Sequence, residues 1–271
     1  MRGLLIGLLL TSGMFQTYNG GTLVLVAATQ DSVLIGADSL VTNSTSKINH
    51  KNKILQLGPS AACAFTGATE VSEKPHGMGD HVDLKKIAAE WAAEHPQVSL
   101  TDGFEAISKL LIDSQDKFFE KHHSPTMDQS TPATTFTCVG LKNGKPWANA
   151  RNYYYPSGKI TQNHQAIPMG EFHALGAAGV AEEVTSGYKV NFAEEKMVPA
   201  VRKYRQYKHA KQTPLLSQSE WLELFKACFR ATESKEGRQF DKESVDVAGP
   251  HDFAIIDKTG FHWIEKNNSR N

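Results

Sequence analysis

Apolar and polar residues along the chain follow two periods, one typical of strands and one typical of helices. The runs Thr22–Ala28 and Val33–Ala37 are apolar and rich in β-branched residues, and the residues between them favour turns. This pattern predicts a β-hairpin. After a polar loop, residues 53–57 and 61–66 predict two more strands, and Gly67 closes the second of them.

Helical periodicity then replaces the strand pattern. Residues 84–94 and 102–121 repeat apolar side chains every three or four positions, which predicts two amphipathic helices. The rest of the chain is expected to form strands at 134–141, 147–155 and 159–166, helices at 180–192, 193–209 and 218–231, and a closing hairpin at 252–264. Blocks of strands separated from blocks of helices predict an α+β fold with antiparallel sheets layered against helices. No linker or repeat divides residues 22–271, so we expect them to form a single domain.

The first 21 residues differ in composition from the rest of the chain. Arg2 precedes a short apolar run, and a polar segment from Gln16 to Gly21 follows. This arrangement resembles a secretory signal peptide, and the apolar run is too short to span a bilayer. A signal peptide implies export to a periplasm or out of the cell, and without one the protein is expected in the cytoplasm. A removable propeptide and a wrongly assigned start are the alternatives.

Overall composition excludes some partners and metal sites. The 29 basic and 29 acidic residues balance, which gives no support for binding to nucleic acid or to an anionic membrane. Because the apolar run near the start is short, no stable membrane insertion is expected. The three cysteines stand far apart, so neither a disulfide framework nor a zinc site is expected, and Cys63 and Cys138 lie in apolar stretches that predict buried thiols. Histidines at 76, 81, 122 and 123 lie in polar sequence without a matching set of ligands, so no metal and no cofactor is expected.

The start of the first strand carries a more specific pattern. The run from Gly21 to Ser39 resembles the opening of proteasome β subunits and their bacterial ring-protease relatives. In that family a Gly-Thr bond is cut to expose a threonine, and an aspartate follows sixteen residues later. Thr22 and Asp38 have this spacing.

Three later segments extend the resemblance. Lys53 and Gly67, fourteen residues apart, match a lysine and a glycine of the family, and residues 175–179 and 246–250 resemble its Gly-Ser-Gly turn and its Asp-x-x-Ser-Gly segment. The resemblance covers nearly all of the chain after residue 21. It implies a four-layer αββα sandwich of N-terminal-nucleophile hydrolases, with two antiparallel sheets flanked by helices.

The resemblance also implies a catalytic set of five residues. Thr22 is the expected nucleophile, and its own α-amine, once freed, takes the hydroxyl proton. Lys53 is expected to lower the pKa of that hydroxyl, and Asp38 to hold the lysine charged. Gly67 is expected to offer its N–H to the oxyanion, and Asp246 matches the second aspartate of the family.

Plainer interpretations exist for three of these residues. Thr22 suits a strand by its β propensity, Lys53 suits an exposed strand edge, and Gly67 suits an ordinary turn. For Gly67 the turn and the catalytic role are compatible.

The chain departs from the family where supporting serines are expected. Ala177, Ala178 and Gly249 stand at those positions. By the same register, four residues are expected to line the pocket for the substrate residue before the cut bond, and these are Val41, Lys51, Phe65 and Thr69.

Together these features favour a threonine-type peptidase that acts on peptides or unfolded proteins and assembles into a homo-oligomeric ring. One alternative is a non-catalytic assembly subunit with the same fold. The other is a monomeric exported amidohydrolase that acts on small amides.

Overall fold

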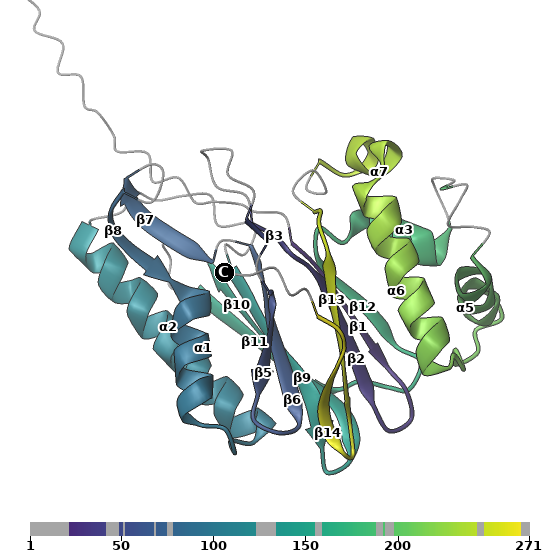
Figure 1. Cartoon of the computed structure of the whole chain (residues 1–271), viewed down its shortest axis with the longest axis horizontal. Coiled ribbons are helices and arrows are strands. Elements are labelled where there is room, and N and C mark those ends of the chain that lie inside the picture. Colours follow the sequence, from purple (N-terminus) through teal and green to yellow (C-terminus); the bar gives the residue numbers. More distant parts are fainter. Residues whose placement is uncertain are drawn as a thin grey trace, which may run out of the picture.

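Two five-stranded antiparallel sheets lie face to face at the centre of the molecule, and helices cover the outer side of each (Figure 1). The computed structural model describes residues 22–41, 49–50, 52–67, 69–74, 78–122, 134–154, 159–187, 192, 198–242 and 247–266. The α+β class and the αββα layering expected from the sequence are confirmed.

The first sheet contains both ends of the described chain. In spatial order its strands are β12 (Phe172–Gly176), β1 (Leu23–Ala28), β2 (Val33–Asp38), β13 (His251–Asp257) and β14 (Gly260–Glu265). The hairpin predicted from residues 22–37 forms, with Val24 opposite Ala37 and Ala28 opposite Val33. The closing hairpin also forms and pairs with β2, so the last strands complete a sheet that the first strands begin.

The second sheet is built from the middle of the chain. In spatial order its strands are β11 (Lys159–Ala166), β10 (Lys145–Tyr154), β9 (Thr134–Lys142), β6 (Ala61–Gly67) and β5 (Ile54–Leu57). The turn between β9 and β10 is made by Asn143 and Gly144, both with positive φ, as hairpins of two-residue loops require. Two short pairs of strands accompany the sheets, β3 (Leu40–Val41) with β4 (Asn49–His50) and β7 (Glu70–Lys74) with β8 (Met78–Asp83).

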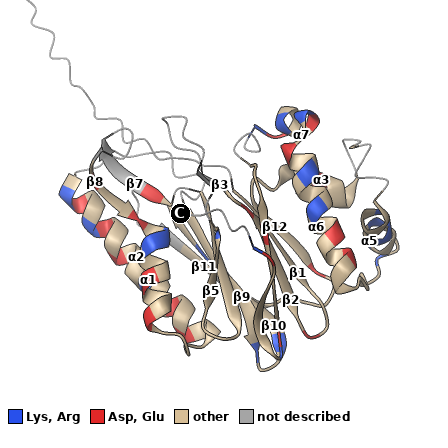
Figure 2. Cartoon of the chain, in the orientation of Figure 1, with Lys and Arg blue, Asp and Glu red and all other residues tan. Residues whose placement is uncertain are grey.

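The helices form the two outer layers. They are α1 (Leu84–Glu94), α2 (Leu100–His122), α3 (Gly179–Ser186), α5 (Pro199–His209), α6 (Gln218–Glu233) and α7 (Lys235–Phe240). Helices α1 and α2 pack on the second sheet, and α3, α5 and α6 on the first (Figure 1). Charged residues are frequent on these helices, whereas the strands between them carry few (Figure 2). No helix in the described ranges is both long enough and apolar enough to cross a bilayer.

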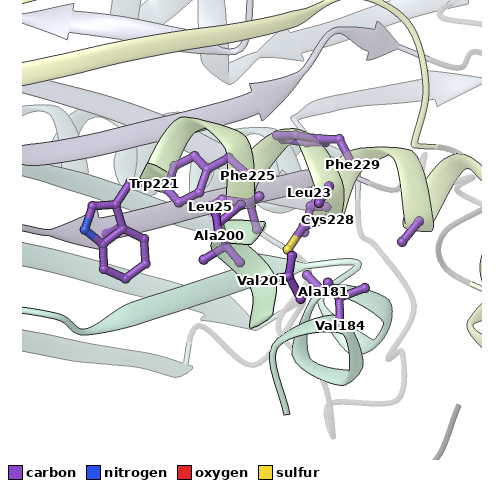
Figure 3. Packing of buried hydrophobic residues seen from close by; sticks show 14 of the residues in the cluster. Leu23, Leu25, Ala181, Val184, Ala200, Val201, Trp221, Phe225, Cys228 and Phe229 are labelled. Carbon is purple, nitrogen blue, oxygen red and sulfur yellow. The ribbon is translucent and has the colours of Figure 1, made fainter. Parts of the chain in front are cut away.

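Strand β1 is buried on both faces, which explains its uninterrupted apolar sequence. Because successive residues of a strand point to opposite faces, Leu23 and Leu25 pack under α6, where Phe225 also lies (Figure 3). Val24 and its alternate neighbours point the other way, into the core between the sheets. The beginning of β1 is therefore held by two layers at once.

Some local expectations were wrong. Strands β7 and β8, which precede the predicted helix, were not anticipated, and neither were β12 and α7. The helix expected over 180–192 ends at Ser186, because Gly187 adopts a left-handed conformation with φ of 72°.

The expectation of buried thiols at Cys63 and Cys138 was wrong. Cys63 on β6 lies directly opposite Cys138 on β9, and the two form a disulfide. Cys228 is buried and is not part of a disulfide. Their separation of 75 residues gives no hint of the pairing, which depends on the register of two strands that the α1–α2 region separates in sequence.

Candidate active site

Four of the predicted site residues lie at one end of the sandwich. Thr22 immediately precedes β1 and Asp38 ends β2, so the antiparallel hairpin brings them to the same edge. Lys53 immediately precedes β5, and Gly67 ends its antiparallel partner β6. The two hairpins thus present their open ends to each other.

The side chains of Thr22, Lys53 and Asp38 form a continuous hydrogen-bonded chain. The Lys53 Nζ donates to Thr22 Oγ1 at 3.0 Å and to Asp38 Oδ2 at 2.8 Å. The other carboxylate oxygen of Asp38 accepts from the backbone N–H of Leu23 at 2.9 Å. The lysine therefore joins the threonine hydroxyl to a carboxylate that the start of β1 itself holds in place.

This ion pair lies in the interior of the protein. The side chain of Lys53 is 1% exposed and that of Asp38 is fully buried. Burial raises the pKa of Asp38 above its usual value, while the charge and hydrogen bond of Lys53 and the Leu23 amide act in the opposite direction. Because an unpaired charge is costly in such surroundings, each of the two residues needs the other, and the plainer interpretation of Lys53 as an exposed edge lysine is wrong.

The backbone of Thr22 is fixed by the turn after β12. Thr22 O accepts a hydrogen bond from the N–H of Ala177 at 3.0 Å. Gly176 has a φ of +77°, and a Cβ at this position would lie 1.9 Å from Thr22 O. Only glycine therefore allows the turn to approach the threonine this closely.

The remaining predicted residues are placed less fully. Gly67 has a φ of +81° and pairs with Thr134 of β9. Asp246 and Lys51 lie outside the described residues, as does the side chain of Val41. The catalytic role of Asp246 stays a prediction.

Two of the predicted pocket residues can be located. Phe65 is 2% exposed, and its ring packs against Phe136 with the centroids 4.8 Å apart. Thr69 is partly exposed, and its carbonyl accepts a hydrogen bond from the first N–H of α1. A role of these residues in substrate specificity stays a prediction.

One residue near the site was missed by the sequence analysis. Thr66, next to Gly67 on β6, is 6% exposed, and its Cβ lies 3.1 Å from the position that a Cβ on Gly176 would occupy. Strand alternation could have found it, because Ala62 and Ala64 point between the sheets and Thr66 continues that face.

Within the described ranges, no group of three or more His, Cys, Asp or Glu residues is arranged to hold a metal ion. What the described side chains bring together at this end of the sandwich is a threonine hydroxyl and a buried ammonium group. A threonine hydroxyl in this setting is a potential nucleophile.

Comparison with known proteins gives a likeness in fold. Of the solved structures, the Anbu (Gly-1) mutant from Hyphomicrobium sp. strain MC1 aligns with a TM-score of 0.50 and 12% identity, over 90% of this chain and 85% of that one. The helical assembly of the Anbu complex from Pseudomonas aeruginosa aligns with a TM-score of 0.56 and 11% identity, over 91% of this chain and 88% of that one. At these identities the likeness shows a proteasome-like fold and nothing finer.

The family assignment made from the motifs is overturned. No protein-family model matches the chain, no curated protein matches it, and the structures described above are Anbu proteins of very low identity. The motifs are two to five residues long and coincide with strand ends and turns, where a shared fold alone favours glycine, aspartate and threonine. The resemblance to proteasome β subunits therefore does not make this chain a member of that family.

Proposed function

We propose that the chain is a threonine-type hydrolase that cleaves amide bonds in peptides, with Thr22 as its nucleophile after the preceding residues are removed. The observation that carries this proposal is the buried contact of Thr22 Oγ1 with Lys53, itself paired with Asp38. A threonine chosen only for its strand propensity has no need of a buried ammonium beside its hydroxyl, because burying that charge is costly.

The proposed reaction has two halves. The α-amine of Thr22 takes the hydroxyl proton as Oγ1 attacks the carbonyl carbon of the substrate. Lys53 stabilises Thr22 Oγ1 as this oxygen loses its proton and gains negative charge. The resulting ammonium returns the proton to the leaving amine, and the C–N bond breaks to give an ester on Thr22. Water, deprotonated by the same amine, then hydrolyses the ester and restores the free threonine.

The proposal requires removal of the first 21 residues, because an amide nitrogen in place of the free amine is not a base. We propose that these residues direct export and that the mature chain is a single domain from residue 22. The Cys63–Cys138 disulfide supports export, since such bonds persist in oxidising compartments. Alkylation of the denatured mature protein without reductant should label Cys228 alone, whereas labelling of all three cysteines contradicts the oxidised state.

Self-association is part of the proposal. The Anbu complex from Pseudomonas aeruginosa, which shares the fold, forms a helical assembly. We propose that this chain also assembles from identical copies into a ring. Sedimentation velocity should give a particle of several chains, and electron microscopy distinguishes a closed ring from a helix. A monomer at micromolar concentration contradicts the assembly and favours the small-amide hydrolase.

The test of activity uses the precursor expressed in full and the mature protein recovered from it. The wild type should begin at Thr22 and cleave fluorogenic peptide amides. Thr22→Ser keeps a hydroxyl and should keep activity, while Thr22→Ala should lose it by at least about a thousandfold, since nucleophile and base act as one unit. Equal activity of the alanine variant contradicts the proposal.

A non-catalytic subunit is the second candidate, and one observation favours it. The turn against Thr22 offers only the methyl groups of Ala177 and Ala178, where hydroxyls would help to orient the amine. A mature chain that keeps Gly21 and still assembles into a large particle supports this candidate over the hydrolase.

A further inference from the structure

A hydroxyl other than that of Thr22 lies close to the candidate site. Thr66 is on β6, beside Gly67, and it is 6% exposed. Its alternate neighbours Ala62 and Ala64 belong to the core between the sheets. Thr66 therefore continues that face at the end of the sandwich where Thr22 lies.

The turn after β12 brings Thr66 and Thr22 together. A Cβ built on Gly176 would lie 3.1 Å from the Cβ of Thr66 and 3.1 Å from the carbonyl carbon of Thr22. The two threonines thus approach the same point. The absence of a side chain on Gly176 leaves room for both.

The hydroxyl of Thr66 is available for a hydrogen bond. In the described part of the chain no hydrogen bond involves Thr66 Oγ1, whereas the hydroxyl of Thr22 is held by Lys53. After Gly176 the turn continues with Ala177 and Ala178, which carry no hydroxyl. Thr66 therefore brings to this turn a hydroxyl that no described group binds.

We propose that Thr66 is a positioning residue for the freed α-amine of Thr22. Its hydroxyl accepts a hydrogen bond from that amine, directly or through one water, and so turns the nitrogen lone pair toward Thr22 Oγ1. In this chain it supplies the hydroxyl that Ala177 and Ala178 lack. The proposal rests on the function proposed above.

The test distinguishes the effect of the Thr66 hydroxyl from the effect of the shape of its side chain. Thr66→Val keeps the branched side chain and removes the oxygen, and Thr66→Ser keeps the oxygen and removes a methyl group. A matched control is Thr137→Val, because Thr137 also lies on the inter-sheet face, opposite Ala64, and its buried hydroxyl has no partner. The three variants and the wild type are recovered as mature chains from the full precursor.

We expect kcat of Thr66→Val on a fluorogenic peptide amide to fall about tenfold, as for one lost hydrogen bond to a charged group. KM and the melting temperature should stay at the wild-type values. Thr66→Ser should recover most of kcat, and Thr137→Val should not differ from the wild type. A packing role predicts the reverse order, with valine tolerated and serine impaired.

Wild-type kcat in Thr66→Val, or an equal loss in the serine variant, overturns the role of Thr66 while the function of Thr22 stands. An inactive wild type overturns both. If the valine variant does not fold, Thr66→Ala and Thr66→Ser are compared instead. Activity in the serine variant but not in the alanine variant then supports the proposal, and equal activity in the two overturns it.

Discussion

The buried pair of Lys53 and Asp38 makes a prediction about stability that does not depend on activity. Asp38→Asn keeps the shape of the side chain and an oxygen for the N–H of Leu23, but it leaves the Lys53 ammonium without a counter-charge. Removing one partner of a buried pair costs about 3–5 kcal/mol of the free energy of unfolding. For a domain of this size the melting temperature should fall by about 6–20 °C.

The double variant identifies the cause of that loss. Asp38→Asn combined with Lys53→Met removes both charges, and a buried pair replaced by uncharged residues often costs little. We therefore expect the double variant to be more stable than Asp38→Asn alone, by about 2 kcal/mol or more. Lys53→Met alone should lose less free energy of unfolding at acid pH than at neutral pH. Burial already raises the pKa of Asp38, so in acid its carboxyl takes up a proton and no unpaired charge remains buried.

The measurement is urea unfolding of the mature proteins, followed by circular dichroism, with the exposed pair Lys86–Glu90 as control. Its side chains are 69% and 64% exposed, so Glu90→Gln should leave the unfolding midpoint unchanged within error. A free energy of unfolding for Asp38→Asn within about 0.5 kcal/mol of the wild type would refute the buried pair. A double variant less stable than either single one would refute the explanation by unpaired charge.

Three further predictions concern the turn, the disulfide and a helix cap. Gly176→Ala should abolish peptide cleavage and destabilise the fold. The positive φ alone costs an alanine roughly 1–2 kcal/mol, and the loss should be larger because the added Cβ would lie 1.9 Å from Thr22 O. Unchanged turnover contradicts the close approach. Replacing Cys63 and Cys138 by alanine should lower the free energy of unfolding by about 4.5 kcal/mol, as expected for a closed loop of 75 residues, and loss of less than about 1 kcal/mol in a urea titration contradicts that contribution. In the N-terminal cap of α6, the pKa of Glu220 is lowered by its hydrogen bonds with Lys203 and with the N–H of Ser217. The stability that Glu220 contributes is therefore complete above pH about 4.5 and is lost as the pH falls through the lowered pKa of the folded state. The difference in urea unfolding midpoint between the wild type and Glu220→Gln should shrink in acid, and a constant difference contradicts the assignment.

The strands and helices that the sequence predicted well are those whose pattern is local. The hairpin of residues 22–37 and helix α1 have uninterrupted periodicity and clear ends. The β7–β8 hairpin has neither, since its residues are mostly polar and its pairing depends on the position of α1 and β6. Long-range pairing, as for Cys63 with Cys138, could not be predicted, because strand order decides which residues face each other.

In the candidate site, too, contacts between distant parts of the chain could not be predicted. The resemblance in motifs pointed to Thr22, Asp38 and Lys53, and the structure brings these three together in one hydrogen-bonded chain. Thr66 was missed because its importance depends on the approach of β12 from the other sheet, near Gly176. The family was wrongly assigned because motifs at strand ends report the shape of a fold more than ancestry.

The most direct test of Thr22 as the nucleophile is mass spectrometry of the mature protein after treatment with a hydroxyl-acylating β-lactone. The protein should begin at Thr22, and the N-terminal peptide should carry the opened lactone as an ester on that residue. Lys53→Met, assayed under conditions in which it is folded, should remain unlabelled. A chain that keeps Gly21, or an acyl group on any other residue, would contradict the proposed function.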